Sequence, residues 1–372
     1  MRHHAPDIRS YGMVRKMKSS TRTTTGAHTD AGSHSFLRAF LQSRRHPGLM
    51  PRGINDWDTP LDPDGPGSVP VILIHGTWMN SYCTWSGLVP ELLAAGHRVF
   101  ALDYGRDPSC LLGRSPACFG NAALLDSAPE VAEFIDSVLE RTGARQVDLV
   151  GHSQGVAQAR LYLTDFGGAG RPGDGVAPKV RRLVGFAASH HGTTASGVGT
   201  LGKTLLARGW YAPLRRILGR CAEDQMTGSA TMAHINRDGD TVPGVDYTMI
   251  CSRYDEVVTP WRTQQMDAGE GAVVRNILVQ DEGNGRDFSE HLALLYSPRA
   301  LDIALEALDH GPEGDYRRRR PTVRGAVVPL WGAVGKRRNA ASSTVSATAP
   351  AGTGATAAGN SPADAESPAL RQ

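Results

Sequence analysis

The chain of 372 residues lacks several features that define other classes of protein. It has no run of 18 or more apolar residues, so no transmembrane helix is expected. Its formal net charge is only +3. The chain therefore lacks the strongly basic character that would indicate nucleic acid as a partner. Residues 1–45 contain no apolar segment of seven or more residues, so no secretory signal is recognisable. Two explanations stay open: an intracellular protein, or an assigned translation start that misses a signal.

Cysteine is scarce and present in an odd number, five, which leaves at least one free thiol in a monomer. Cys110 and Cys118 lie eight residues apart around a Gly-Arg-Ser-Pro turn, and a disulfide between them would close one loop. Unpaired thiols in a reducing compartment explain the same cysteines equally well. The sequence does not decide between these two interpretations.

Hydrophobic content of 40% and charged content of 21% are ordinary for a globular enzyme. Composition divides the chain into three parts. Residues 1–52 are predicted to be a poorly ordered extension, in which 35–41 fit a short helix, and residues 53–310 to form one domain. Residues 311–372 are predicted to be a disordered tail rich in Arg, Ala, Ser and Thr. For the apolar segment 326–334 in this tail, we favour a solvated tail over a weak lipid-surface contact.

The central part alternates short apolar runs with amphipathic segments. Buried strands are predicted at residues 69–74, 98–104, 147–150, 180–187, 245–251 and 273–279, and helices at 85–95, 127–142, 154–164 and 299–308. This alternation predicts an α/β fold: a doubly wound, mainly parallel sheet with helices on both faces. Residues 189–244 lack this alternation of strands and helices and are predicted to be a cap or lid-like insertion. Their apolar segment 200–218 fits a lid over an acyl pocket and a helix pair packed on the core equally well.

A Gly-x-Ser-x-Gly motif, Gly151 to Gly155, follows the strand at 147–150 and opens the helix at 154–164. A sharp strand-to-helix turn of this kind lifts its serine above the sheet edge and aims helix amides at the reacting atoms. Ser153 is therefore the predicted nucleophile. The alternative, a tight turn whose serine only caps the helix, explains the motif but not its context.

A serine hydroxyl needs a base, and the base needs an orienting carboxylate. In this fold class the order along the chain is serine, acid, histidine, each after a strand. Asp255 follows the strand at 245–251 and is the predicted acid, with Glu256 as the neighbour that could be confused with it. His291, after the last strand, is the predicted base. Structural or pocket-wall roles are preferred for His152, His190, His191 and His234.

Two backbone amides should stabilise the tetrahedral oxyanion. One is predicted at Gln154, directly after the nucleophile. The other is predicted at Thr77, in the His-Gly-Thr-Trp loop that follows the strand at 69–74, with Trp78 as the second choice. A simple strand-ending turn is the alternative interpretation of this loop.

Taken together, several motifs resemble the actinobacterial class 2 lipases, which are esterases of the α/β-hydrolase superfamily. The resemblance covers residues 53–309. It rests on Ile74–Thr77, Gly151–Gly155, His191–Thr193, Asp240–Gly244, Tyr254–Pro260 and Ser289–Leu292. It implies an α/β-hydrolase fold, a triad of Ser153, Asp255 and His291, and hydrolysis of carboxylic esters, with acylglycerols among the substrates. The relatives are usually secreted, whereas no secretory signal is recognisable in this chain.

The predicted reaction proceeds through an acyl-enzyme on Ser153 and needs no cofactor or metal. The predicted partner is a small-molecule ester or lipid; nucleic acid is not expected, and no obligate protein partner is evident. Two alternatives stay open: an acyltransferase on the same fold, in which an alcohol or amine replaces water, and a non-catalytic binding protein that kept the fold. The intact serine, acid and histidine candidates argue against the second.

Overall fold

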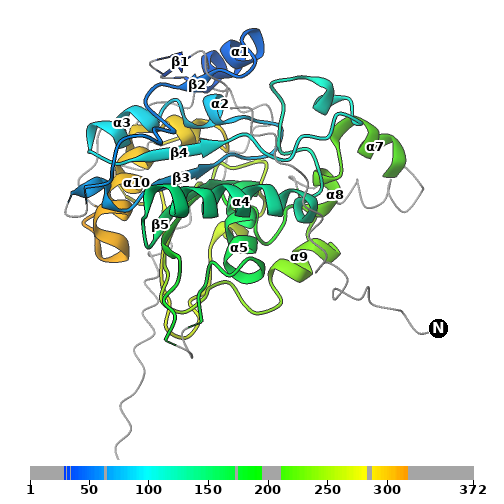
Figure 1. Ribbon diagram of the computed structural model, residues 1–372. Coiled ribbons are helices and arrows are strands. Elements are labelled where there is room, and N and C mark those ends of the chain that lie inside the picture. Colours follow the sequence, from blue (N-terminus) through cyan, green and yellow to red (C-terminus); the bar gives the residue numbers. More distant parts are fainter. Residues whose placement is uncertain are drawn as a thin grey trace, which may run out of the picture.

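The computed structural model describes residues 29–30, 32–33, 35–62, 65–171, 175–194, 211–282 and 287–316. Its centre is a six-stranded sheet in the order β4-β3-β5-β6-β7-β8, and every neighbouring pair in it is parallel (Figure 1). The strands are β3 (Val71–Ile74), β4 (Val99–Leu102), β5 (Val147–His152), β6 (Val180–Phe186), β7 (Asp246–Cys251) and β8 (Val273–Leu278). All six correspond to predicted strands, and the doubly wound parallel sheet is confirmed.

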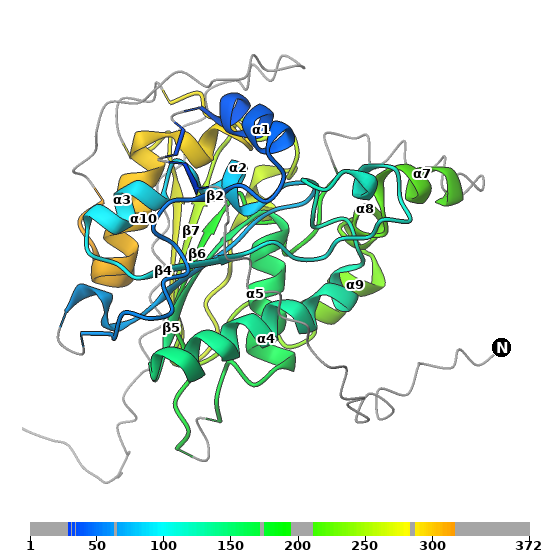
Figure 2. The ribbon, with the colours of Figure 1, turned by 45° about the horizontal axis from the view of Figure 1, so that its top comes forward.

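Helices cover both faces of this sheet. Helices α3 (Val89–Ala94) and α10 (Pro298–His310) lie on one side, and α4 (Leu124–Thr142) and α5 (Gln154–Asp165) lie on the other (Figure 2). Side chains alternate along a strand, so Val71 and Leu73 enter the core beside α10, while Ile72 and Ile74 enter the core beside α4 and α5. A strand buried on both faces must be apolar throughout, which explains the continuous Val-Ile-Leu-Ile run of β3.

The predicted helix at 85–95 was wrong in its bounds, because two short helices occupy this part of the chain. Helix α2 (Ser81–Trp85) is capped by Asn80, whose side chain accepts a hydrogen bond from the Cys83 N–H at 2.9 Å. Helix α3 follows after a turn and has Pro90 in its first turn. Asparagine is a common helix cap, and proline is favoured in the first turn of a helix. Asn80 and Pro90 therefore signal the starts of α2 and α3, which apolar periodicity does not show.

Part of the N-terminal segment packs on the domain. Helix α1 (Phe36–Arg45) overlaps the helix predicted at 35–41 and extends beyond its end, and it buries Phe36 and Ala39 in the core beside α10. A short strand, β1 (Thr29–Asp30), pairs in parallel with β2 (Met50–Pro51). At the other end Tyr316 is buried after η8 (Gly311–Glu313). The predicted extension before residue 29 and the predicted tail after residue 316 lie outside the described residues.

The described residues of the insertion at 189–244 include three helices, which lie at one end of the molecule, beyond α5 (Figure 1). They are α7 (Tyr211–Leu218), α8 (Cys221–Asp224) and α9 (Ala230–Ile235). Residues 195–210, which include most of the predicted lid segment, lie outside the described residues. Among the described residues there are also short 3-10 helices, including η2 (Pro66–Ser68), η3 (Leu112–Arg114), η6 (Trp261–Gln264) and η7 (Ala293–Tyr296).

All five cysteines are buried free thiols, so the loop disulfide between Cys110 and Cys118 is not formed. Burial raises the pKa of the Cys83 thiol to about 12, which leaves it protonated and unreactive at neutral pH. Within the described ranges, no helix combines the length and apolar character needed to cross a bilayer.

Candidate functional site

Ser153 lies at a strained turn between β5, which ends at His152, and α5, which begins at Gln154. Its backbone has φ 52° and ψ −117°, a conformation that L-residues rarely adopt. Its N–H donates to the Phe186 carbonyl at 2.9 Å, and its carbonyl accepts from the Val156 N–H at 3.1 Å. These backbone bonds hold the turn in place despite its strain, as expected for a serine presented by a nucleophile elbow.

The two glycines of the motif are required by close backbone contacts. A Cβ atom on Gly155 would lie 2.1 Å from the Ile74 carbonyl oxygen, and one on Gly151 would lie 2.7 Å from the Val156 nitrogen. No side chain fits at either distance. The Gly-x-Ser-x-Gly spacing is thus explained by the packing of the turn between β3 and α5.

His291 and Asp255 form a buried pair. Asp255 follows β7 and His291 follows β8, and His291 Nδ1 lies 2.7 Å from Asp255 Oδ2. The side chain of His291 is 5% exposed and that of Asp255 0%. Because both residues follow the carboxyl ends of parallel strands, the topology places them at the same sheet edge as Ser153.

Three further donors fix the carboxylate. Asp255 Oδ1 accepts from the N–H groups of Val257 at 2.9 Å and Val258 at 2.8 Å. Asp255 Oδ2 also accepts from Gln264 Nε2 at 3.0 Å. Burial by itself would lower the pKa of His291, but the Asp255 carboxylate and its hydrogen bond raise that pKa above the ordinary value. A histidine held in this way is a better proton acceptor than an isolated buried one.

His152 connects the serine turn to His291. Its ring centroid lies 4.7 Å from that of His291, and its Nε2 lies 3.2 Å from the His291 carbonyl oxygen. Burial, reinforced by His291, lowers the pKa of His152 well below its usual value. The ring is therefore neutral and donates Nε2–H to that carbonyl. The residue directly before Ser153 thus contacts the predicted base, and this explains its role as a wall of the site.

The loop after β3 folds back against His152, because a Cβ atom on Gly76 would meet His152 Nδ1 at 2.6 Å. His75 Nδ1 lies 2.8 Å from the Gly76 carbonyl oxygen, and His75 Nε2 accepts from the Tyr104 N–H at 3.3 Å. Burial lowers the pKa of His75, so its ring stays neutral and can donate on one side while accepting on the other. These bonds fix the turn that leads to Thr77.

Thr77 and Gln154, the two predicted oxyanion donors, are joined by their side chains. Thr77 Oγ1 donates to Gln154 Oε1 at 3.2 Å and accepts from Gln225 Nε2 at 2.8 Å. Gln225 in turn accepts at Oε1 from Ser189 Oγ at 2.9 Å. Gln225 follows α8 in the insertion, so the insertion supports the loop directly. Sequence reasoning missed Gln225 and Gln264 because a glutamine outside any motif gives no signal of its partner.

The rival histidines lie elsewhere. His234 pairs with Asp165 at 2.7 Å on a partly exposed surface. His191 pairs with Asp240 at 2.7 Å, and His190 packs beside it with ring centroids 4.2 Å apart. Burial lowers the pKa of His190 well below its usual value, so this ring is neutral. Neither His190 nor His191 is bonded to Asp255, and their preferred structural roles fit these positions.

Comparison with known proteins identifies the family and the fold. The family model described as Lipase (class 2) matches residues 68–291, which is more than half of the chain. The structure of lipase B from Aspergillus fumigatus is similar at 18% identity and a TM-score of 0.50, over 74% of this chain and 58% of that one. The chain therefore spans less than two thirds of that lipase, and the likeness concerns the fold alone.

A lipase of Bacillus licheniformis in its mature form is also similar, at 15% identity and a TM-score of 0.46, over 68% of this chain and 96% of that one. The family match, the parallel sheet and the strand–serine–helix turn lead to one conclusion. The chain belongs to the class 2 lipase family, and its fold is that of the α/β-hydrolases.

Proposed function

We propose that this chain is a serine carboxylic-ester hydrolase that forms an acyl-enzyme on Ser153. The observation that carries the proposal is the buried pair of His291 Nδ1 and Asp255 Oδ2, 2.7 Å apart, at the sheet edge where the strained Ser153 turn lies. A pair of this kind orients the ring so that Nε2 serves the nucleophile. Family membership supports an ester-hydrolysing reaction.

In the first half-reaction, His291 Nε2 takes the Ser153 proton as Oγ attacks the ester carbonyl carbon. The electron pair of the carbonyl moves onto its oxygen, which the backbone amides of Thr77 and Gln154 stabilise. Asp255 stabilises the imidazolium that forms. His291 then gives its proton to the leaving alcohol as the C–O bond breaks, and the acyl group stays on Ser153.

In the second half-reaction, water replaces the alcohol. His291 takes a proton from the water as it attacks the acyl carbon, and the same amides hold the oxyanion. The Ser153–acyl bond breaks, the serine recovers its proton, and the acid leaves. Neither half consumes a cofactor. The proposed substrates are carboxylic esters of lipids, with acylglycerols foremost, in keeping with the family.

The test is hydrolysis of p-nitrophenyl esters of graded chain length by the wild type, by Ser153→Ala and by Ser137→Ala. Ser137 bonds the Phe134 carbonyl on α4, so its variant controls for loss of a serine hydroxyl elsewhere. We expect Ser153→Ala to lose about 10⁴- to 10⁶-fold in kcat and Ser137→Ala to keep its activity. A fluorophosphonate should label the wild type at Ser153. Full activity of Ser153→Ala would refute the proposal.

An acceptor alcohol added to the same assay separates hydrolysis from acyl transfer. A hydrolase releases mainly the free acid, whereas an acyltransferase releases mainly the new ester. We expect the acid to dominate at low alcohol concentration.

A further inference from the structure

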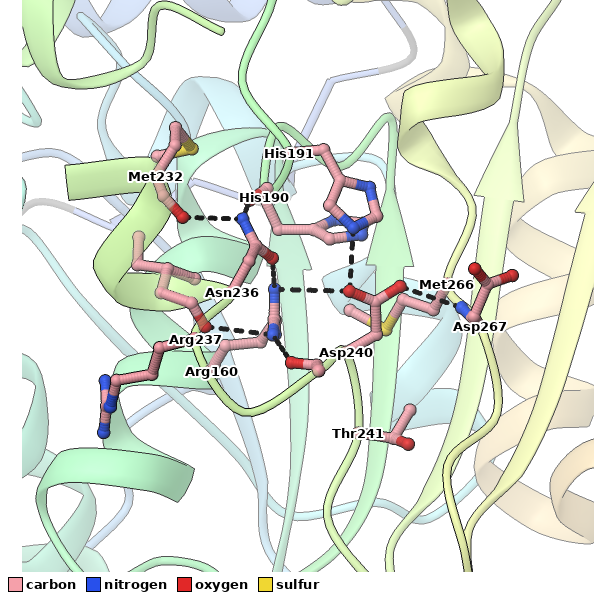
Figure 3. Close-up of polar contacts among 12 residues, drawn as sticks. Arg160, His190, His191, Met232, Asn236, Arg237, Asp240, Thr241, Met266 and Asp267 are labelled. Atoms are coloured by element: carbon pink, nitrogen blue, oxygen red, sulfur yellow. Dashed lines mark hydrogen bonds and ion pairs between the residues drawn. The ribbon is translucent and has the colours of Figure 1, made fainter. Parts of the chain in front are cut away.

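A second cluster of histidine and carboxylate side chains lies outside the proposed triad. His190 and His191 follow β6, and Asp240 lies in the segment that leads to β7 (Figure 3). One potential ligand atom from each of the three residues lies within 4.8 Å of the others. Figure 3 shows the two rings side by side above the Asp240 carboxylate. The proposed reaction uses none of these residues.

His190 has one ring nitrogen without a hydrogen-bond partner among the described residues. Its side chain is fully buried, and its Nε2 lies 3.1 Å from the Gln265 carbonyl oxygen. Its Nδ1 is buried without a hydrogen-bond partner among the described residues. Because a ring nitrogen that faces a carbonyl oxygen donates to it, Nε2 carries the proton, and Nδ1 is the nitrogen that can offer a lone pair to a ligand. A buried acceptor without a donor is costly, which points to a partner that is not a protein atom.

His191 and Asp240 are oriented in the same manner. His191 Nδ1 lies 3.0 Å from the Thr263 carbonyl oxygen, which directs Nε2 to Asp240 Oδ1 at 2.7 Å. Asp240 Oδ2 accepts from the Asp267 N–H at 2.8 Å. In each of the three side chains, the polar atom that is not a proposed ligand is thus held by one backbone hydrogen bond. This is the arrangement that orients histidine and carboxylate ligands around metal ions.

One neighbour works against a cation. Arg160 Nη1 lies 3.9 Å from Asp240 Oδ1, and the guanidinium is held in place by Asn236 and by the carbonyls of Ile235 and Gly239. Its positive charge already partly neutralises Asp240 and repels a second cation. Arg160 therefore lowers the affinity of the cluster without blocking the two imidazole nitrogens.

We propose that His190 Nδ1, His191 Nε2 and Asp240 Oδ1 bind a divalent transition-metal cation, with water completing its coordination. Two imidazoles and one carboxylate suit Zn²⁺ and Co²⁺ better than the oxygen-seeking Mg²⁺ or Ca²⁺. The cation replaces the proton shared by His191 and Asp240, and that proton is released to solvent. The proposed hydrolysis needs no metal, so the cation has a structural role.

The position of the cluster indicates what the cation stabilises. Thr263 and Gln265, whose carbonyls hold the two histidines, flank Gln264. Gln264 donates to the carboxylate of Asp255. Binding at the cluster therefore stiffens the segment that supports the proposed catalytic acid. We expect a higher thermal midpoint with metal and little change in kcat.

The experiment uses the full chain, stripped with a chelator and titrated with Zn²⁺ alone by calorimetry and with Co²⁺ alone by absorption. The wild type should bind one equivalent that Asp240→Asn and His191→Ala lose, while His234→Ala, which removes the histidine–aspartate pair with Asp165 elsewhere on the molecule, retains it. Arg160→Gln should tighten binding about tenfold, because it removes a charge next to the cation. Circular dichroism checks that each variant is folded.

The Co²⁺ spectrum of the wild type tests the proposal even if a variant does not fold. Nitrogen and oxygen ligands give ligand-field bands without the thiolate charge transfer that a cysteine site would add. The proposal is overturned by the absence of saturable one-to-one binding, by a thiolate band, or by unchanged binding in folded Asp240→Asn and His191→Ala.

Discussion

Two histidine–carboxylate pairs in this molecule have the same length and different surroundings. The ring nitrogen lies 2.7 Å from the carboxylate oxygen in both His291–Asp255 and His191–Asp240. Around Asp255 the other donors are neutral: two backbone amides and the amide of Gln264. Beside Asp240 lies the charged guanidinium of Arg160. A developing positive charge on the histidine is thus stabilised better in the first pair than in the second.

The pairs also differ in which nitrogen they use. His291 bonds its carboxylate through Nδ1, which leaves Nε2 for a reacting group. His191 turns Nε2 to its carboxylate and Nδ1 to the Thr263 carbonyl, so both nitrogens are engaged within the protein. A short histidine–carboxylate contact alone therefore does not identify a base. The base is identified by the neighbours of the carboxylate and by what the remaining ring nitrogen contacts.

The largest expected difference is between His291→Ala and His191→Ala. We expect the first to lower kcat/KM by about 10⁴- to 10⁶-fold and the second to stay within about threefold of the wild type. Initial rates with a short-chain p-nitrophenyl ester measure both. A comparable loss in a folded His191→Ala would contradict the division of roles between the two pairs.

The next comparison is Asp255→Asn with Asp240→Asn. Asp255 raises the pKa of His291 above the ordinary 6.5, and catalysis needs the neutral ring, so kcat/KM of the wild type should fall as pH drops through that raised value. Asp255→Asn should lower kcat by about 10⁴-fold and move the acidic limb of the profile to lower pH. Asp240→Asn should leave the limb in place. A limb that moved with Asp240→Asn instead would reverse the assignment.

A smaller effect is expected from Gln264→Leu, which removes the neutral donor to Asp255 Oδ2 and preserves side-chain volume. We expect kcat to fall about tenfold with KM nearly unchanged, because the carboxylate is oriented less well. Gln265→Leu is the matched control, since the backbone carbonyl of Gln265, which meets His190, is kept. Equal rates for the two variants would show that Gln264 does not position Asp255.

The smallest effect is expected on the oxyanion side. Gln225→Leu removes the hydrogen bond to Thr77 Oγ1 and should lower kcat about three- to tenfold without moving the acidic limb of the pH profile. The control is Thr231→Val, which removes a hydroxyl from the same insertion that bonds Asp224 instead of Thr77. A shift of the pH limb in Gln225→Leu would mean that Gln225 acts through the histidine pairs rather than through Thr77.

The sheet could be predicted well from the sequence because strands buried on both faces consist of continuous apolar runs, as in residues 71–74. It also singled out Ser153, whose flanking glycines are dictated by contacts shorter than any side chain allows. The pairing of His291 with Asp255 followed from chain order in this fold class. These features are local or topological, so a linear pattern can carry them.

Other features depend on which distant residues meet. Gln225 reaches Thr77 across 148 positions, and His191 reaches Asp240 across 49. Asp240 and His191 each stand in a motif of the family resemblance, but neither motif says that the two side chains meet. Helix α2 was missed because its signal is a cap at Asn80 and not an apolar stripe. Tertiary packing decides such contacts, and the periodicity of residues along the chain carries no information about them.

Trp78 offers a direct optical readout of the insertion. Its indole Nε1–H donates to the Leu218 carbonyl at 2.7 Å, where α7 ends, and it directly follows the proposed oxyanion donor Thr77. Breaking that bond would change the polarity around the indole and hence its emission. The difference in fluorescence between the wild type and Trp78→Phe therefore reports, in real time, whether the end of α7 stays docked while an ester is bound and turned over.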